Sequence, residues 1–173
     1  VQAALSSVFE HLNIPLPGHD SPGLRAGVEG GFEEASSRVV EAIGRWTSEP
    51  VWLVGYSMGA RVAMHVALSE PSPVKGLVLI GGHPGLTSVA QREERLALDH
   101  ERASRLESEG LAAFLQAWYE LPLFGSLRAR PDFHARLESR LCRDPDAVSC
   151  TLRRLSTGHQ ADLRPLLSSL SLP

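Results

Sequence analysis

The sequence predicts an α/β fold: a parallel sheet core that carries a sharp strand-to-helix turn and is followed by an all-helical insertion. Two apolar runs of strand length, residues 51–54 and 74–80, flank a helical pattern, which is the spacing of a βαβ unit. A Gly-x-Ser-x-Gly pentapeptide stands between the first strand and that helix. After Gly85 the pattern becomes charge-rich and helical, with no convincing strand.

The core elements follow from apolar spacing. Residues 1–12 place Val, Leu and Phe at helical intervals and predict an amphipathic helix, and residues 13–16 form a short apolar stretch that could end a strand. A dense run of turn formers fills residues 17–23. Residues 32–46 and 58–69 each carry one apolar helical face. Both strands are apolar on both faces, as expected of parallel strands buried under helices.

The insertion predicts several helices. A mixed-charge helix spans the region around residues 92–102, a shorter apolar one covers 111–119, and two more follow near 132–142 and 146–156. Residues 163–170 form a helix or loop that returns to the core. We therefore divide the chain into a partial core (1–86), a helical cap (87–162) and a return segment (163–173).

Composition narrows the function classes. The chain is 43% hydrophobic and 21% charged with a formal net charge of −3, which gives no reason to expect nucleic acid or an anionic membrane as partner. No apolar run approaches the roughly 20 residues that cross a bilayer. Cys142 and Cys150 lack metal-ligand spacing and are expected to be free thiols in a reducing cytoplasm. No metal or cofactor is expected, and the oligomeric state stays open.

The pentapeptide Gly55-Tyr56-Ser57-Met58-Gly59 carries the chemistry. In this position G-x-S-x-G is the nucleophile elbow of the α/β-hydrolase fold, where a strained turn lifts the serine hydroxyl off the sheet. Gly55 and Gly59 supply the small neighbours that such a turn needs. Ser57 then lies at a helix N-terminus, where the N–H of Met58 can donate to a developing oxyanion. The alternative is a tight turn with an incidental serine.

A longer match extends this interpretation. The stretches LVGYSMGARVAMHVAL, LVLIGGHPGL, QREERLALD and AWYELPLFGSL resemble the 2-succinyl-6-hydroxy-2,4-cyclohexadiene-1-carboxylate synthases, α/β-hydrolase-fold lyases of menaquinone and phylloquinone biosynthesis. The resemblance covers roughly residues 13–170, and its most specific parts are GGHPGL and WYELPLF. The upstream LPGHDSPG is similar to the family's loop before the elbow, although such loops are common in the superfamily.

The resemblance implies a carbon–oxygen lyase. In that family a serine–histidine pair removes a proton from a polycarboxylate that carries an enol-pyruvyl group, and pyruvate is eliminated. Such a polyanion needs fixed cationic forks, for which arginine suits carboxylates better than lysine. The carry-over assigns Ser57 as the catalytic serine, Met58 as the oxyanion donor, and Tyr56, Arg61, Arg95, Trp118 and Arg140 as substrate-binding residues. Arg136 or Arg143 could replace Arg140, because the spacing there differs by about one residue.

Each assignment has a plainer alternative. Arg61 could be a surface charge, and Arg95 lies among alternating charges that are typical of a solvated helix face. Trp118 could belong to a core. His83 and His19, which lie in turn-rich loops, are expected to be structural rather than catalytic.

The sequence also departs from the family. Only two firm strands and a doubtful third are found, and no residue is assigned as the triad acid or histidine, since His159 and Asp162 come in the wrong mutual order. We therefore expect an internal piece of a longer protein, nearly inactive alone. Two other functions remain open, a carboxylic-ester hydrolase and a non-catalytic remnant that binds carboxylates.

Overall fold

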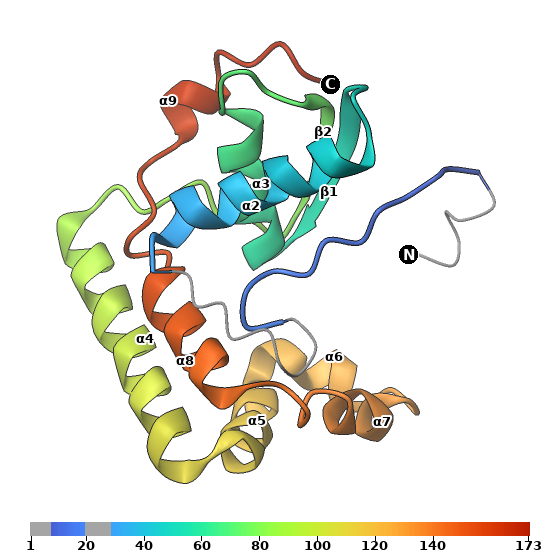
Figure 1. Ribbon diagram of the computed structural model, residues 1–173. Coiled ribbons are helices and arrows are strands. Elements are labelled where there is room, and N and C mark those ends of the chain that lie inside the picture. Colours follow the sequence, from blue (N-terminus) through green and yellow to red (C-terminus); the bar gives the residue numbers. More distant parts are fainter. Residues whose placement is uncertain (1–7, 20–28) are drawn as a thin grey trace.

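Two parallel strands, β1 (Val51–Tyr56) and β2 (Val74–Ile80), lie side by side in the computed structural model, which describes residues 8–19 and 29–173. Helix α3 (Met58–Ala67) connects them, and α2 (Gly31–Trp46) packs on α3 (Figure 1). The register places Val54 opposite Val78 and Gly55 opposite Leu79. The predicted βαβ unit is confirmed.

The core lies between the sheet and these two helices. The apolar face of α2 packs against α3 and one strand face in a cluster that comprises Phe32, Ala35, Val39, Ile43, Val62, Val66, Val74 and Leu155. The other strand face is open among the described residues, where Trp52, Val54 and Tyr56 are 54%, 51% and 71% exposed. Both faces of β1 are thus apolar, but only one is covered.

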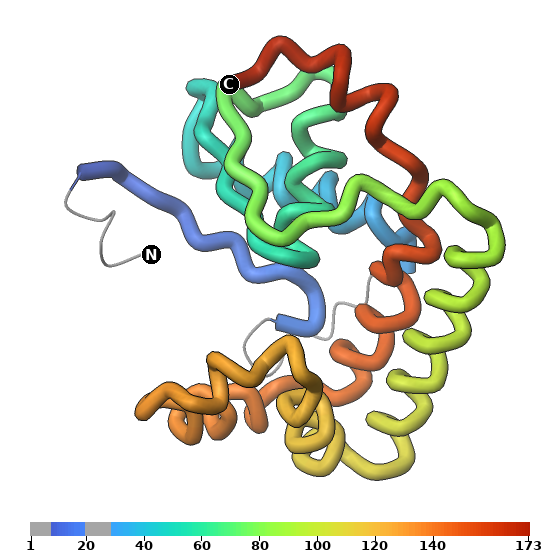
Figure 2. Tube along the Cα trace, turned by 180° about the vertical axis from the view of Figure 1, so that it is seen from behind, coloured from blue at the N-terminus to red at the C-terminus, as the bar shows by residue number. Residues whose placement is uncertain are grey.

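The insertion consists of helices joined by turns and loops, with no strand among its described residues, as predicted. It comprises α4 (Val89–Glu109), α5 (Leu111–Glu120), η1 (Pro122–Phe124), α6 (Gly125–Arg128), α7 (Phe133–Glu138) and α8 (Pro145–Arg154). Helices α4 and α8 pack side by side, while α5, α6 and α7 gather at the end far from the sheet (Figure 2). The helix expected over 132–142 ends early, because residues 139–143 continue in successive tight turns.

The two connections of the cap to the core lie against each other. The Nε2 of Gln160 donates to the carbonyl oxygen of His83 at 2.9 Å, and the Leu163 N–H donates to that of Pro84 at 2.7 Å. Gly85 has φ 111°, and a Cβ there would lie 2.1 Å from the Ala161 oxygen. We call residues 83–85 together with 160–163 the clasp. Beyond it, α9 (Arg164–Leu167) leads back along the core.

The N-terminal expectation is wrong where it can be tested. Residues 9–16 form neither helix nor strand, and residues 1–7 lie outside the described residues. Instead of a helical stripe, the alternate residues Ile14 and Leu16 pack against the core, whereas Val8 and Phe9 stay exposed. An amphipathic helix is stable only where its apolar face packs against another apolar surface. This segment contacts the core in an extended conformation instead. No helix in the described ranges is long and apolar enough to cross a membrane.

Candidate active site

Ser57 stands in a strained turn between β1 and α3. Its φ of 52° and ψ of −113° make it the one non-glycine residue with positive φ among residues 8–19 and 29–173. Its N–H donates to the Ile80 carbonyl oxygen at 2.8 Å, which ties the turn to the end of β2. Such a conformation costs on the order of 1–3 kcal/mol and persists only where the surroundings hold it. The Ser57 side chain is exposed.

The two glycines of the elbow are not equivalent. A Cβ on Gly55 would lie 2.5 Å from the carbonyl oxygen of Gly59 and 2.6 Å from the Cα of Ala60, so only glycine lets α3 turn back over the strand. A Cβ on Gly59 would meet nothing closer than a Leu16 methyl at 3.9 Å among the described atoms. The steric requirement is therefore confirmed at Gly55 and is wrong at Gly59.

The surroundings of the hydroxyl are those of an anion-stabilising turn. Met58 is the first residue of α3, so its N–H has no acceptor within the helix. Tyr56 lies one residue before the serine on the exposed face of β1. The Ser57 hydroxyl makes no capping hydrogen bond, and no histidine or carboxylate within the described ranges bonds to it.

Arg61 lies one helical turn after Ser57 and is partly buried rather than a free surface charge. Its Nη1 donates to the Leu155 carbonyl oxygen at 2.6 Å, and its guanidinium lies over the Phe32 ring at 5.3 Å from the centroid. The pKa of Arg61 is lowered to about 10, mainly by burial and then by the charge of Arg95, while the charge of Asp99 opposes both effects. The charges of Arg61 on α3 and Arg95 on α4 therefore interact, although the two residues belong to different segments of the chain.

Arg95 belongs to a network on α4. Its Nε donates to Asp99 Oδ2 at 2.7 Å, and Nη1 of Arg102 donates to Oδ1 of the same carboxylate at 2.9 Å. Arg102 in turn lies over the Trp118 ring at 5.1 Å. Asp99 is only 2% exposed. The plainer alternative, a fully solvated helix face, therefore does not describe the side of Arg95 that contacts Asp99, and its assignment as a substrate-binding residue stays a prediction.

Trp118 packs in the aromatic cluster of the cap. Its ring stacks on Phe114 at 5.7 Å between centroids and approaches Phe124 at 6.0 Å. The structure thus joins Trp118 to Arg95 through Asp99 and Arg102. Sequence analysis missed Asp99 and Arg102, although their i+4 and i+7 spacing from Arg95 was a usable signal for one helix face.

The three candidates for the third substrate-binding arginine, Arg136, Arg140 and Arg143, differ in the groups that they contact. Arg136 is held by Asp132, with a 2.7 Å ion pair on an exposed surface. Arg140 makes no ion pair within the described ranges, and its guanidinium lies over the Tyr119 ring at 5.5 Å. Burial and the neighbouring Arg140 lower the pKa of Arg143. Two arginines, Arg140 and Arg143, therefore remain available to an anion.

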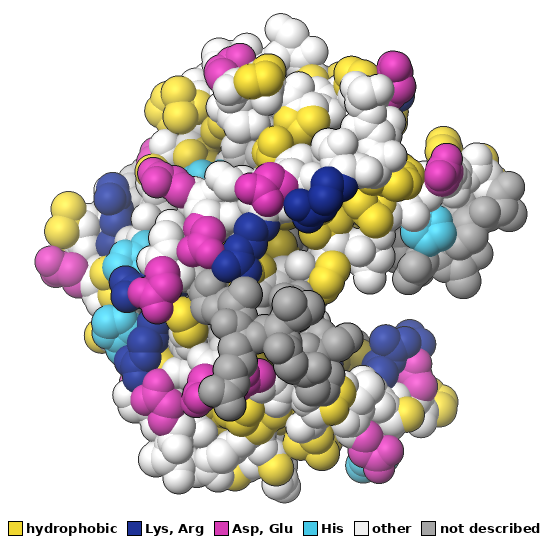
Figure 3. Space-filling model, viewed as in Figure 1, with side chains coloured by type: hydrophobic (Ala, Val, Ile, Leu, Met, Phe, Trp, Pro, Cys, Tyr) yellow, Lys and Arg dark blue, Asp and Glu magenta, His cyan; other side chains and the backbone are white. Residues whose placement is uncertain are grey.

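The Leu16–His19 loop bridges the elbow and these arginines. Leu16 approaches Gly59, and the Pro17 carbonyl oxygen accepts a hydrogen bond from the Thr151 hydroxyl at 3.0 Å. Desolvation lowers the pKa of His19, and the charges of Arg143 and then Arg140 add to that effect. In the space-filling view the molecule is hollowed between the core and the α6–α7 end of the cap (Figure 3).

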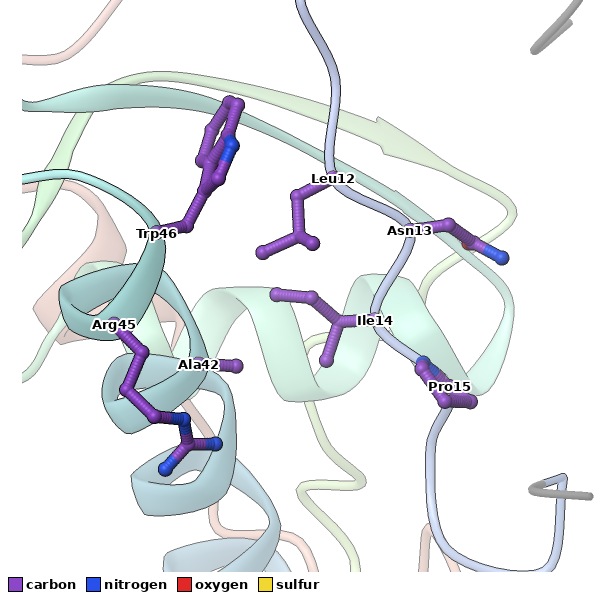
Figure 4. Close-up of a pocket in the computed structure, with 7 residues that line it drawn as sticks. All are labelled: Leu12, Asn13, Ile14, Pro15, Ala42, Arg45 and Trp46. Carbon is purple, nitrogen blue, oxygen red and sulfur yellow. The ribbon is translucent and has the colours of Figure 1, made fainter.

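The remaining candidates are structural or lie elsewhere. The Nδ1 of His83 accepts from the Gly85 N–H at 3.2 Å inside the clasp, and Asp162 pairs with Arg164 at 2.7 Å. A pocket of about 390 Å³ lies between residues 12–15 and the end of α2, where Leu12 and Ile14 point towards Trp46, and Ser57 does not line it (Figure 4). No group of three potential ligand side chains that could hold a metal occurs in the described ranges.

Comparison with protein families and curated proteins gives consistent matches. The sequence model of the alpha/beta hydrolase family matches residues 1–171. The 2-succinyl-6-hydroxy-2,4-cyclohexadiene-1-carboxylate synthase of Serratia proteamaculans (strain 568) is 39% identical over 164 residues, which cover 94% of this chain and 63% of that protein. Its counterpart from Enterobacter sp. (strain 638) is 33% identical over 95% of this chain and 63% of its own. The chain thus spans about 63% of the length of these relatives.

Solved structures give the same picture. MenH from S. aureus superposes with a TM-score of 0.82 at 30% identity, covering 92% of this chain and 61% of that one. A hydrolase from Pseudomonas aeruginosa PA01 matches with a TM-score of 0.65 at 20% identity, over 89% of this chain and 57% of that one, which is a likeness of fold alone.

Proposed function

The chain belongs to the alpha/beta hydrolase family, and from its 39% and 33% identity to two 2-succinyl-6-hydroxy-2,4-cyclohexadiene-1-carboxylate synthases we propose that its protein is a carbon–oxygen lyase of menaquinone biosynthesis. The proposed reaction eliminates pyruvate from an enol-pyruvyl cyclohexene carboxylate and yields 2-succinyl-6-hydroxy-2,4-cyclohexadiene-1-carboxylate. The observation that carries the proposal is a pair of cations beside the elbow: Arg61 lies one helical turn after the strained and exposed Ser57, and the charge of Arg95 on α4 lowers the pKa of Arg61.

This arrangement suits a substrate with several carboxylates. Asp99 already pairs with one nitrogen of Arg95 but leaves that side chain 38% exposed, so its remaining N–H donors favour an added anion. A neutral ester supplies no such anion, whereas a polycarboxylate accepts paired hydrogen bonds from each arginine fork. The cap arginines Arg140 and Arg143 would hold a further carboxylate. A polycarboxylate therefore fits the described residues better than a simple ester does.

The elimination assigns a role to each residue of the elbow. A base that acts with the Ser57 hydroxyl takes a proton from the ring carbon, the electron pair forms a ring double bond, and the bond to the enol-pyruvyl oxygen breaks. The released enolpyruvate takes up a proton and becomes pyruvate. The Met58 N–H would stabilise negative charge that develops on the substrate, and Tyr56 and Trp118 would line the site. The division into core (1–86), cap (87–162) and return segment (163–173) stays a prediction.

The test compares two reactions on protein expressed from the complete reading frame that contains these residues. Pyruvate release from the enol-pyruvyl precursor is followed with a coupled reductase, and p-nitrophenyl ester cleavage is followed by absorbance. We expect pyruvate release that Ser57→Ala and Arg95→Gln reduce by at least about tenfold, with the exposed Arg45→Gln as the matched control.

The other outcomes select the other functions. Fast ester cleavage without pyruvate release would identify an ester hydrolase. Binding of carboxylates without any reaction, at an affinity that Ser57→Ala leaves unchanged, would identify a non-catalytic binding protein. Either result would overturn the lyase proposal.

A further inference from the structure

Within that proposed function, on which this inference rests, we infer that Asp99 is a positioning residue that aims the Arg95 guanidinium at the substrate carboxylate. The carboxylate of Asp99 accepts from Arg95 on one oxygen and from Arg102 on the other, at 2.7 and 2.9 Å. Each arginine meets it with one nitrogen, so the other N–H groups of Arg95 stay free to meet a ligand. Asp99 itself does not need to touch the substrate.

Burial gives Asp99 this role. Its side chain is 3% exposed, whereas the side chain of Arg95 is 38% exposed and that of Arg102 is 22% exposed. A fixed buried acceptor that holds a half-exposed guanidinium orients the exposed part without covering it. Other ion pairs of the cap, such as Arg105–Glu109, join two exposed side chains and lack this asymmetry.

The network also reaches the aromatic wall of the cap. Arg102 lies between Asp99 and the Trp118 ring. The Asp99 carboxylate therefore orders Arg95 directly and Trp118 through Arg102, and the family resemblance assigns both Arg95 and Trp118 to the site. Loss of the Asp99 carboxylate would let Arg95 and Arg102 adopt other rotamers, and the Arg102 guanidinium would leave the face of the Trp118 ring. The state of Arg102 is therefore visible in the fluorescence of Trp118.

A positioning role and a mere charge role predict opposite results for Asp99→Asn. Removing one negative charge beside a cationic site strengthens anion binding if charge alone matters. If Asp99 aims Arg95, the substitution weakens anion binding instead, by about 10- to 100-fold, because an oriented charged hydrogen bond is lost. The exposed Glu101 lies two residues along α4, so Glu101→Gln removes the same charge without the same contacts and is the matched control.

The experiment titrates citrate, a small tricarboxylate, into wild type, Asp99→Asn and Glu101→Gln by calorimetry. We expect weaker binding only for Asp99→Asn, and no further loss when Asp99→Asn is added to Arg95→Ala, because the two residues act through one contact. Tighter binding in Asp99→Asn, or losses that add in the double variant, would overturn the inference. Circular dichroism establishes that each variant is folded.

Two readouts need no ligand and separate this inference from the proposed function. The Arg95 Nε–H resonance should lose its protection in Asp99→Asn, and Trp118 emission should change in a background where Trp46 and Trp52 are replaced by Phe. If wild type fails to bind citrate, the carboxylate site fails while these two signals still decide on Asp99. If both signals stay unchanged in a folded Asp99→Asn variant, Asp99 positions neither arginine.

Discussion

Arg61 and Leu155, 94 residues apart in the chain, are joined by a 2.6 Å hydrogen bond from the Arg61 Nη1 to the Leu155 carbonyl oxygen. Arg61 lies one turn after Ser57 on α3, and Leu155 caps the end of α8. The bond thus links the elbow helix to the last helix of the cap. It also sets the direction of the guanidinium before any ligand arrives.

Replacing Arg61 by methionine tests the structural share of this bond. The Leu155 carbonyl oxygen would lose its side-chain donor in a residue that is 2% exposed, so the free energy of unfolding should fall by about 1–3 kcal/mol. Urea unfolding measures the change. Arg45→Met, on the exposed end of α2, should change it by less than about 0.5 kcal/mol. Equal losses in the two variants would contradict a role for the bond.

The elbow glycines offer a matched pair. Gly55→Ala places a methyl group against the backbone of α3 and should lower stability by about 1–3 kcal/mol or prevent folding. Gly59→Ala has room for its methyl group within a helix, where alanine is favoured over glycine by up to about 1 kcal/mol. Thermal unfolding of both variants decides. A Gly59→Ala variant as unstable as Gly55→Ala would show that atoms beyond the described ones crowd this position.

Ser57 should trade stability for chemistry. Glycine tolerates the backbone angles of the elbow without steric cost, so Ser57→Gly should unfold at higher denaturant, with a gain of about 1 kcal/mol, and lose pyruvate release. Ser57→Ala should lose the same activity without that gain, because alanine keeps the strain. If the glycine variant is no more stable than the alanine variant, the turn stores no strain.

His65 should make the protein acid-sensitive. Burial lowers the pKa of His65 from its ordinary 6.5, opposed by the charge of Glu33 and aided by that of Arg61. As the pH falls below about 6.5, the unfolded chain binds a proton that the folded chain resists, so stability is present above that value and declines below it. The Nε2 atom is also buried without a hydrogen-bond partner among residues 8–19 and 29–173, and the ring stacks on Phe32 at 4.8 Å between centroids.

His65→Phe should therefore raise the melting temperature, and by more at about pH 5 than at about pH 8, because phenylalanine keeps the stack and cannot be protonated. Melting curves at both values, with the exposed His100→Gln as control, test this. A gain that is independent of pH would mean that His65 titrates alike in both states.

Substitutions of the cap arginines should change KM to different extents, because the arginines have different contacts. Arg140→Gln should raise KM for pyruvate release by about tenfold or more, because Arg140 has no acidic partner within the described ranges and its replacement removes a guanidinium that can bind the substrate. Arg136→Gln should leave KM within about twofold, because its guanidinium already binds Asp132. Steady-state kinetics of the two variants and of Arg143→Gln identify the residue that holds the distal carboxylate. A larger effect at Arg136 would reverse the assignment.

Much of the fold can be predicted from the sequence, because the signals for it lie close together in the chain. The strand, elbow, helix and second strand follow from apolar runs and glycines within about thirty residues, and the cap helices follow from charge and apolar spacing. The N-terminal helix was wrong because periodicity does not reveal whether a surface exists for the stripe to cover. The bond from Arg61 to Leu155 and the burial of Asp99 depend on packing between distant segments, which spacing alone does not specify.

The clasp has a consequence for how a ligand would enter. Both polypeptide crossings between core and cap pass through one small bundle of contacts, with Gln160 against His83 and Leu163 against Pro84. The end of α8 is tied to the core as well, by the hydrogen bond from Arg61 to Leu155 and by the Leu155 side chain in the core cluster. Rotating the cap away from the core about the clasp would therefore break the Arg61–Leu155 bond, so a movement that admits a ligand would also release the guanidinium one helical turn after Ser57.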